Sequence, residues 1–300
     1  MIYVYIGIGL FLLYLLINLI VFLFIFYRPK PLDLTTILPF EYKEKVYEGI
    51  KSIENKPVKE ISILSHDGLK LVGYLFEIPN PESIIILVHG YGSNGFQDFG
   101  SVFDFYQSFK QNILIVSQRA HNKSEGKFCT YGIKESMDIE NWVQFVNKLY
   151  PNLPIRFSGI SLGSSTILFA KDKKLPNVIS MVSDCGFISP IEEIKHVAKR
   201  VYHLPPFLFI GVVGIYAKIF LKINIKQRIT DSYNKTSIPV VFIHGKADNY
   251  VPFWMGEELY DKYLGPKEKL FIDNAKHGNS YFEDMDTVKK GICDFFLENK

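Results

Sequence analysis

The sequence predicts an α/β fold with a mostly parallel central sheet, helices on both faces, an N-terminal antiparallel hairpin and a helical cap, preceded by one transmembrane helix. Three observations predict this arrangement. From residue 83 onward, short apolar segments alternate with segments of helical periodicity, as they do in βα units. Residues 187–236 interrupt that alternation, and a long apolar segment precedes it.

The N-terminal segment has the composition of a membrane anchor. Residues 2–27 contain no charged side chain, and Asn18 is the only strongly polar one. The segment is longer than the roughly 20 apolar residues that cross a bilayer. It lacks the charged start, the short apolar core and the small-residue cleavage site of a secretory signal. We therefore expect an uncleaved single-pass anchor over residues 1–28, and then a linker with a short helix over residues 29–58.

The charges around this segment predict its orientation. Positive side chains flank it only on the C-terminal side, at Arg28, Lys30, Lys43 and Lys45. Cytoplasmic flanks carry an excess of Lys and Arg. We expect the large domain to lie in the cytoplasm.

Composition excludes several classes of function. The 300 residues suffice for one large domain, which we place at residues 59–300, and a net charge of +3 without basic runs argues against nucleic-acid binding. Cys129, Cys185 and Cys293 are far apart, so no disulfide framework and no metal site is expected. The glycine motifs of nucleotide-binding proteins, G-x-G-x-x-G and G-x-x-x-x-G-K-[ST], do not occur, and no cofactor is expected.

The elements of this domain follow in chain order. Two alternating segments, 61–65 and 69–78, flank an Asp-Gly turn and predict an antiparallel hairpin. The apolar segments that predict strands are 83–90, 112–118, 155–160, 178–184, 239–245 and 269–273. The segments that predict helices are 97–109, 133–149, 162–171, 252–264 and 286–298.

The interrupting segment, residues 187–236, predicts a helical cap. Its part from 207 to 223 is unusually apolar but contains Lys218 and Lys222. A second transmembrane helix there is an alternative, although it would have to sit inside an unbroken sheet order. We favour a cap with an apolar face for a substrate or for a membrane surface.

A G-x-S-x-G pentapeptide, residues 159–163, supplies a candidate nucleophile. Ser161 follows a predicted strand and precedes a predicted helix, which is the context that this motif requires. The turn is tight and strained, so only glycines fit at positions 159 and 163. An alcohol also needs a base to become a nucleophile at neutral pH.

A histidine and an acid follow Ser161 in the chain. His277 lies after the last predicted strand, at the sheet edge that Ser161 also occupies, and Asp248 follows the strand 239–245. Asp184 is the competing acid and His121 the weaker alternative base. The remaining histidines lie in the hairpin turn, in the cap or beside glycines at strand ends: His66, His196, His203, His89 and His244. The order Ser161, Asp248, His277 is one of the known orders of a catalytic triad.

A nucleophilic serine of this kind carries out acyl transfer, which passes through an oxyanion. This oxyanion needs two hydrogen-bond donors. One is expected to be the backbone N–H of Leu162, the residue after the nucleophile. The other is expected from the glycine-rich loop after residue 88, and the N–H of Tyr91 is the best candidate.

From about residue 60 to the C-terminus, the sequence resembles the α/β-hydrolase superfamily. It is most similar there to membrane-anchored bacterial serine hydrolases of the acyl-peptidase and cinnamoyl-esterase-like group. The matching segments are LVHGYGSN (87–94), SQRAHNKSEGKFCTYGIKESMDIENWV (117–143), GISLGSST (159–166), SDCGF (183–187), PVVFIHGKADNYVP (239–252) and AKHGNSYF (275–282). The resemblance implies the triad and the two oxyanion donors named above. One departure is Asn122, which stands where such proteins usually have glycine, and asparagine tolerates the left-handed backbone.

These features predict a serine hydrolase of carboxylesterase type that cleaves a small acyl ester or thioester through an acyl-enzyme. A peptidase or amidase on the same fold is one alternative, and a non-catalytic membrane scaffold is another. We expect association with a membrane through the N-terminal helix, and no nucleic-acid partner.

Overall fold

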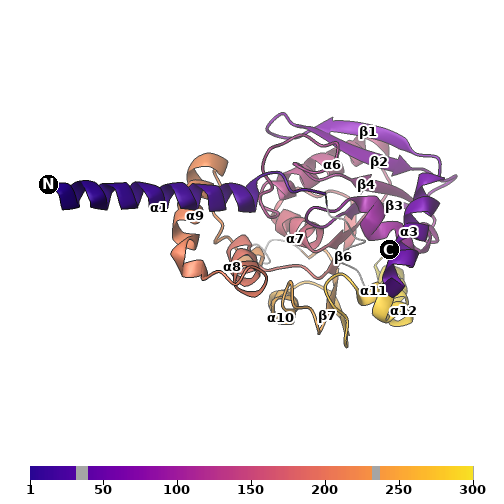
Figure 1. Ribbon diagram of the computed structural model, residues 1–300. Helices are drawn as coiled ribbons and strands as arrows, with labels where there is room; N and C mark the ends of the chain where they lie inside the picture. Colours follow the sequence, from indigo (N-terminus) through magenta and orange to yellow (C-terminus); the bar gives the residue numbers. More distant parts are fainter. Residues whose placement is uncertain (32–39, 232–236, 300) are drawn as a thin grey trace.

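The computed structural model describes residues 1–31, 40–231 and 237–299 (Figure 1). Its centre is an eight-stranded sheet in the order β1-β2-β4-β3-β5-β6-β7-β8. The strands are β1 (Lys59–Leu64), β2 (Lys70–Phe76), β3 (Ser83–Val88), β4 (Gln111–Val116), β5 (Ile155–Ile160), β6 (Val178–Asp184), β7 (Val240–Gly245) and β8 (Lys267–Ile272). Each expected strand is present, and the boundaries differ by one to a few residues.

Strand direction follows the sequence pattern. β1 and β2 form the antiparallel hairpin, and Gly68 in the turn has φ +84°. β2 also pairs antiparallel with β4, whereas all other neighbours are parallel. The carboxyl ends of the parallel strands therefore meet at one edge of the sheet, where ligands bind in such folds.

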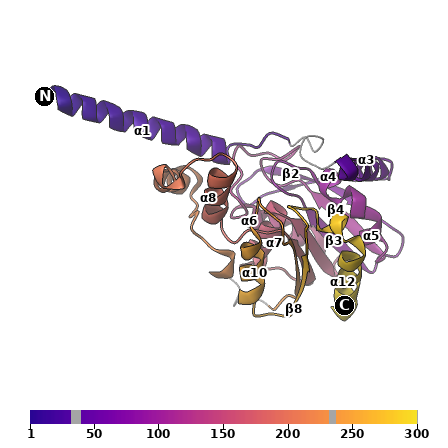
Figure 2. The ribbon, with the colours of Figure 1, turned by 60° about the horizontal axis from the view of Figure 1, so that its bottom comes forward.

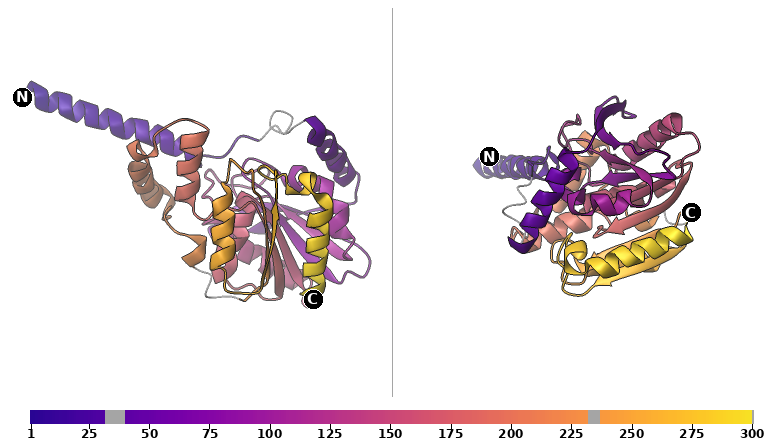
Figure 3. Two further views of the ribbon diagram at one scale, coloured as in Figure 1. Left: turned by 90° about the horizontal axis from the view of Figure 1, so that it is seen from below. Right: turned by 90° about the vertical axis from the view of Figure 1, so that its right-hand side faces the viewer.

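Two apolar layers cover the sheet. On one face, α6 (Glu135–Leu149), α7 (Leu162–Phe169) and α10 (Phe253–Lys262) share an apolar cluster with the sheet, which includes Trp142 of α6 and Phe157 of β5. The other face is covered by α3 (Phe40–Glu54), α4 (Gly95–Phe99), α5 (Phe103–Gln107), α11 (Ser280–Glu283) and α12 (Met285–Glu298). Figure 3 shows α10 and α12 on opposite sides of the sheet.

The prediction of one continuous helix over residues 97–109 is wrong. The structure has α4, a 3₁₀ turn at Gly100–Val102 and α5 in its place. At the break, the backbone of α3 passes so closely that a Cβ on Gly100 would lie 2.7 Å from the carbonyl carbon of Gly49. This contact requires glycine and fixes α3 against the body of the protein.

The first helix, α1 (Ile2–Phe26), projects from the body (Figures 1 and 2). It is the one helix in the described part of the chain that is long and apolar enough to cross a membrane. Three of its residues are buried, Asn18, Phe22 and Phe26, spaced by four along one face.

That face packs against the segment expected as a cap. The described part of this segment contains α8 (Pro190–Arg200), a 3₁₀ turn (Pro206–Leu208), α9 (Ile210–Tyr216) and a π-helical turn (Ala217–Leu221). The last five expected residues, 232–236, lie outside the described residues. A third apolar cluster joins α1 to these helices and consists of Phe22, Phe26, Ile194, Ala198, Phe209, Val213, Ala217, Leu221, Ile223 and Ile225.

Candidate active site

Ser161 stands on a strained turn between β5 and α7. Its φ is +54° and its ψ −114°, outside the regions that a side chain normally allows. A Cβ on Gly163 would lie 1.9 Å from the carbonyl oxygen of Val88, and one on Gly159 would lie 2.5 Å from the carbonyl carbon of Gly163. The two glycines therefore allow the turn that raises Ser161 above the sheet edge.

The structure brings the three side chains expected for a triad into one hydrogen-bonded chain. Nε2 of His277 lies 2.9 Å from Oγ of Ser161. Nδ1 of His277 lies 2.8 Å from Oδ2 of Asp248. In this arrangement Nδ1–H donates to the carboxylate, and the free Nε2 accepts the proton of the serine hydroxyl.

Asp248 is held by its own loop. Its Oδ1 accepts hydrogen bonds from the backbone N–H groups of Tyr250 and Val251, both at 2.9 Å. Burial alone would raise the pKa of Asp248, but the charge of His277 and the hydrogen bonds from His244 and His277 outweigh burial and lower this pKa. The carboxyl group is therefore ionised at neutral pH.

The pKa of His277 moves the other way. Burial would lower the pKa of the imidazole, but the adjacent Asp248 carboxylate has the larger combined effect and holds this pKa well above 6.5. A base of raised pKa accepts a proton more strongly from an alcohol, which suits proton abstraction from Ser161.

The competing candidates are not part of this hydrogen-bonded chain. Asp184 is fully buried, and neither of its carboxyl oxygens has a hydrogen-bond partner among the described residues. His196 contacts the backbone carbonyl of Asn249 in the cap region, and His66 lies 4.0 Å from Asp138 beside the hairpin turn. None of their side chains is hydrogen-bonded to the Ser161 hydroxyl, although the backbone carbonyl of Asp184 accepts the backbone N–H of Ser161 at 2.8 Å.

The loop after β3 runs past the serine. A Cβ on Gly90 would lie 3.6 Å from Cβ of Ser161. Oδ2 of Asp98 accepts the N–H of Gly90 at 2.7 Å, and Nε2 of His121 accepts the N–H of Gly92 at 3.1 Å. The N–H of Tyr91 lies between these two fixed amides and has no acceptor among the described residues, which leaves it free for a ligand.

The backbone N–H of Leu162 is also without an acceptor among the described residues. Its N–H is in the first turn of α7, where helical amides have no partner within the helix. It has no side-chain acceptor among the described residues either. The N–H groups of Tyr91 and Leu162, the two donors expected from the sequence, are therefore both without an acceptor among the described residues.

Two buried histidines support this loop as neutral rings. Nε2 of His89 accepts the N–H of Gln118 at 3.1 Å, and the rings of His89 and His121 lie 5.0 Å apart. Burial lowers the pKa of His89 to about 4 and the pKa of His121 to about 4. Sequence reasoning treated both as loop-orienting or alternative residues, and the structure gives them contacts of that kind.

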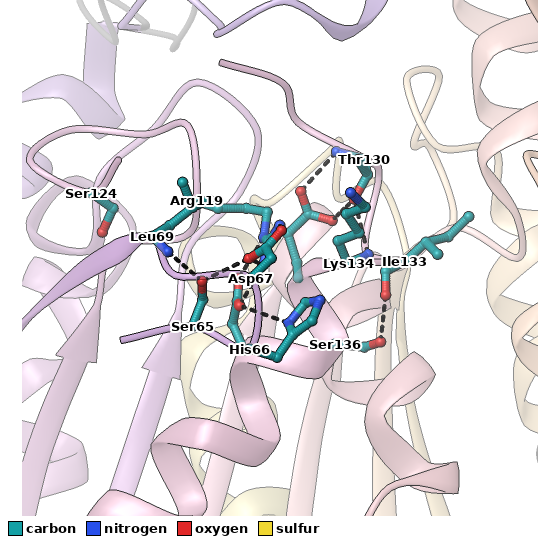
Figure 4. A network of polar contacts seen from close by, with 12 residues as sticks. Ser65, His66, Asp67, Leu69, Arg119, Ser124, Thr130, Ile133, Lys134 and Ser136 are labelled. Atoms are coloured by element: carbon teal, nitrogen blue, oxygen red, sulfur yellow. Dashed lines mark hydrogen bonds and ion pairs between the residues drawn. The ribbon is translucent and has the colours of Figure 1, made fainter. Parts of the chain in front are cut away.

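The neighbouring loop, residues 117–126, is fixed by Arg119 (Figure 4). The Arg119 guanidinium donates to Asp67 at 2.9 and 3.0 Å and to Asp138 at 2.7 and 2.6 Å. Figure 4 shows Asp67 reaching Arg119 from the hairpin turn. Asn122 has φ +45°, so it adopts the left-handed backbone expected for its position.

A cavity of about 480 Å³ opens over Ser161. Its lining comes from the loops after β3 and β7, from the loop before α6, from the segment 187–236 and from the end of α1. Outside α1, the lining residues include Tyr91, Tyr131, Phe187, Val197, Ala198, Tyr202, Leu204, Phe209 and Tyr250. Residues of the α1 end that line it include Val21, Phe24, Ile25, Tyr27 and Arg28. The sequence prediction does not include this part of α1 in the site. The signal for it is Asn18, the only strongly polar residue of the helix, which lies on the buried face with Phe22 and Phe26.

Two further buried groups border the site. Glu193 lines the cavity, its Oε2 has no partner among the described residues, and burial raises its pKa to about 8. The thiol of Cys185 and ligand atoms of Asp248 and His277 lie within 4.8 Å of one another. Both ring nitrogens of His277 already have hydrogen-bond partners, so this trio is explained without a metal ion.

Comparison with known proteins places this arrangement in context. No family model matches the sequence. The chain is 28% identical over 260 residues to the uncharacterized protein YqkD of Bacillus subtilis, covering 84% of this chain and 83% of that protein. It is 26% identical over 186 residues to the lysophosphatidylserine lipase ABHD12 of Danio rerio, covering 59% of this chain and 46% of that protein.

The fold is similar to that of a solved esterase. The Pyrococcus furiosus esterase Pf2001 superposes with a TM-score of 0.69 at 21% sequence identity, covering 91% of this chain and 98% of the esterase. At this level of identity the likeness concerns the fold, which includes the mixed sheet and the helices on both of its faces.

Proposed function

We propose that this chain, a member of the α/β-hydrolase superfamily, is a membrane-anchored serine hydrolase that cleaves a carboxylic ester or thioester through an acyl-enzyme. One observation carries the proposal: Ser161, His277 and Asp248 form a hydrogen-bonded chain, with distances of 2.9 and 2.8 Å, and Ser161 lines a cavity. A strained serine with a base and an oriented acid is the arrangement that activates an alcohol.

In the acylation step, Oγ of Ser161 attacks the carbonyl carbon of the ester as Nε2 of His277 takes its proton. The carbonyl oxygen becomes an oxyanion, which the N–H groups of Tyr91 and Leu162 stabilise. Asp248 stabilises the imidazolium. His277 then gives its proton to the leaving alkoxide or thiolate as the bond to the carbonyl carbon breaks.

In the deacylation step, water replaces the departed alcohol or thiol. His277 takes a proton from this water, and the resulting hydroxide attacks the acyl carbon. The oxyanion forms again at the same two amides, and its collapse returns the proton to Ser161 and releases a carboxylic acid. No metal ion or cofactor enters either step.

The lining of the cavity supports a substrate whose apolar acyl group binds there. Aromatic and aliphatic side chains form most of its walls, among them Tyr131, Phe187 and Leu204. The fold is similar to that of an esterase, and the sequence is similar to that of a lysophosphatidylserine lipase. Both similarities support an ester rather than an amide as the substrate.

We also propose a membrane topology and a domain organisation for the protein. Residues 1–28 form a single-pass anchor, residues 29–58 join it to the hydrolase domain at residues 59–300, and the domain faces the cytoplasm. Protease treatment of intact and of permeabilised cells tests the orientation: the domain is expected to be cleaved only after permeabilisation, and cleavage in intact cells contradicts the assignment.

Activity-based labelling tests the function. We expect a fluorophosphonate probe to label the full-length protein in membranes, and Ser161→Ala to abolish the labelling. Ester hydrolysis should fall at least ~10³-fold in Ser161→Ala and in His277→Ala. His66→Ala, a histidine in the hairpin turn, is the matched control and should keep both.

The same preparation separates the alternatives. A peptide panel tested beside the ester panel shows whether amides are cleaved faster than esters, as the peptidase alternative requires. A wild-type protein inert toward the probe and toward both panels sinks the hydrolase proposal and leaves the non-catalytic scaffold.

A further inference from the structure

The cap has an arm that runs alongside α1. This cap arm, residues 202–222, leaves α8 beside the base of α1, where the rings of Tyr202 and Phe24 lie 5.5 Å apart. It then extends along the helix until the carbonyl oxygen of Leu208 accepts a hydrogen bond from the hydroxyl of Tyr14 at 2.8 Å. Figure 1 shows α9, part of the cap arm, lying beside α1.

The cap arm returns in the opposite direction. The hydroxyl of Tyr216 donates to the carbonyl oxygen of Leu15 at 3.0 Å, and the ring of Phe220 lies 5.8 Å from that of Phe22. Since ten residues separate Tyr14 from Phe24 and a helix rises 1.5 Å per residue, the cap arm reaches about 15 Å along α1.

The surface of the cap arm is apolar. Its exposed side chains include Leu204, Phe207, Leu208, Ile215, Ile219 and Phe220, and Phe207 is 79% exposed. This apolar surface is continuous with α1, where Ile20 and Phe24 are 59% and 65% exposed. Patches of this kind on a protein mark a contact with another apolar phase.

The polar groups of the cap arm fit a membrane. The tyrosine hydroxyls and the carbonyl oxygens that accept from them are paired across α1 and the cap arm, as hydrocarbon surroundings require. Residues 202–222 contain no acidic side chain, and Lys218 and Lys222 lie in the returning half, toward the base. Lysine stems there reach the lipid headgroups.

We propose that the cap arm inserts into the same bilayer leaflet as the domain-proximal half of α1, and that the enzyme takes an amphiphilic lipid ester from that leaflet. A helix that spans the bilayer carries with it whatever is packed along its length, so a cap arm fixed at Tyr14 cannot stay in water. The insertion follows from the anchor, whereas the substrate class rests on the proposed hydrolase function.

The cavity gives the route for such a substrate. Phe24 and Tyr27 of the α1 end form one wall, and Tyr202, Leu204 and Phe209 of the cap arm form another, with Ser161 at the floor. A single acyl chain in the leaflet therefore reaches Ser161 between α1 and the cap arm, while its polar head stays at the membrane surface.

Thiol labelling tests the insertion without using activity. In a Cys293→Ser background, where the other two cysteines are buried, Leu208→Cys is compared with Leu264→Cys, an exposed leucine in the loop before β8. The full-length proteins are placed in lipid nanodiscs, where both membrane faces are accessible. We expect a membrane-impermeant maleimide to react at least tenfold more slowly at position 208.

Depth quenching identifies what covers this site. A fluorophore at position 208 should be quenched by phospholipids brominated in the acyl chain, and one at 264 should not. Equal maleimide rates at the two positions overturn the insertion. Slow reaction at 208 without bromine quenching also overturns it, because a protein, such as a second copy of this chain, then covers the arm. Phe207→Cys repeats the test should Leu208→Cys fail to fold.

A substrate comparison tests the lateral route. Phe207→Asp should lower hydrolysis of a long-chain monoacyl ester embedded in nanodiscs by tenfold or more, and leave that of water-soluble p-nitrophenyl acetate within twofold. Leu264→Asp is the matched control and should change neither. Equal rates for wild type and Phe207→Asp on the embedded ester overturn the route. A wild type inert toward both esters refutes the hydrolase function, and the labelling result stands by itself.

Discussion

Nδ1 of His277 lies 2.8 Å from Oδ2 of Asp248, and this contact raises the pKa of the imidazole above 6.5. Catalysis needs the neutral imidazole, so kcat/KM for a soluble ester should rise with pH through this raised pKa. The acidic limb of the pH–rate profile is therefore expected at a midpoint above 6.5.

Asp248→Asn should move this limb to lower pH, because the carboxylate that stabilises the imidazolium is removed. The rate at the plateau should also fall by roughly 10³- to 10⁴-fold. An unchanged midpoint in the variant would mean that Asp248 does not set the pKa of His277.

Gly163→Ala should damage the turn that holds Ser161. The added Cβ would lie 1.9 Å from the carbonyl oxygen of Val88, so β3 or α7 must shift, at a cost of roughly 1–3 kcal/mol. Thermal melting in detergent and the rate of fluorophosphonate labelling should both decrease. Gly211→Ala is the control, because a Cβ there meets nothing within 4 Å.

Arg119→Met should destabilise the domain strongly. It leaves the buried Asp138 without its cationic partner, and breaking a buried pair costs about 3–5 kcal/mol. Lys123→Met breaks an exposed pair with Glu60 and should cost at most about 1 kcal/mol. Denaturant unfolding in detergent measures both, and equal losses would contradict the role of Arg119 in fixing its loop.

The contribution of His121 to the stability of the fold should fall as the pH is lowered from 7 to 5. Burial lowers the pKa of His121 to about 4, so the unfolded chain binds a proton in this range and the folded chain does not. By linkage, each such histidine removes about 2 kcal/mol of unfolding free energy at pH 5.

His121→Gln should reduce this pH dependence. Its amide oxygen can accept the N–H of Gly92 without titrating, so the variant should lose less stability between pH 7 and pH 5. Melting temperatures at the two pH values measure the difference, and equal slopes in both proteins would argue against His121 as a source.

The sheet could be predicted because its signals are local. Each parallel strand is a short apolar segment, and Ser161, Asp248 and His277 each follow one, so their meeting at one edge follows from the topology. The break at Gly100 could not be predicted, since it depends on the distant Gly49.

The contribution of α1 to the cavity was also missed. Its buried Phe22 and its exposed Phe24 are equally apolar, so hydropathy does not distinguish the packed face from the exposed one. In the sequence, only the polar Asn18, one helical turn before Phe22, marks the packed face.

The junction between α1 and the domain is short and is held by backbone and side-chain hydrogen bonds. Arg28 donates from its backbone to Lys127 at 2.7 Å and from its guanidinium to the carbonyl oxygen of Ser124 at 3.0 Å, and Phe26 accepts from Cys129 at 2.8 Å. In the proposed membrane-anchored arrangement, these hydrogen bonds hold the active site at a fixed height above the lipid. Turnover should then follow the mole fraction of ester in the membrane surface, and diluting that surface with inert lipid should slow the enzyme even when the total ester in the sample is constant.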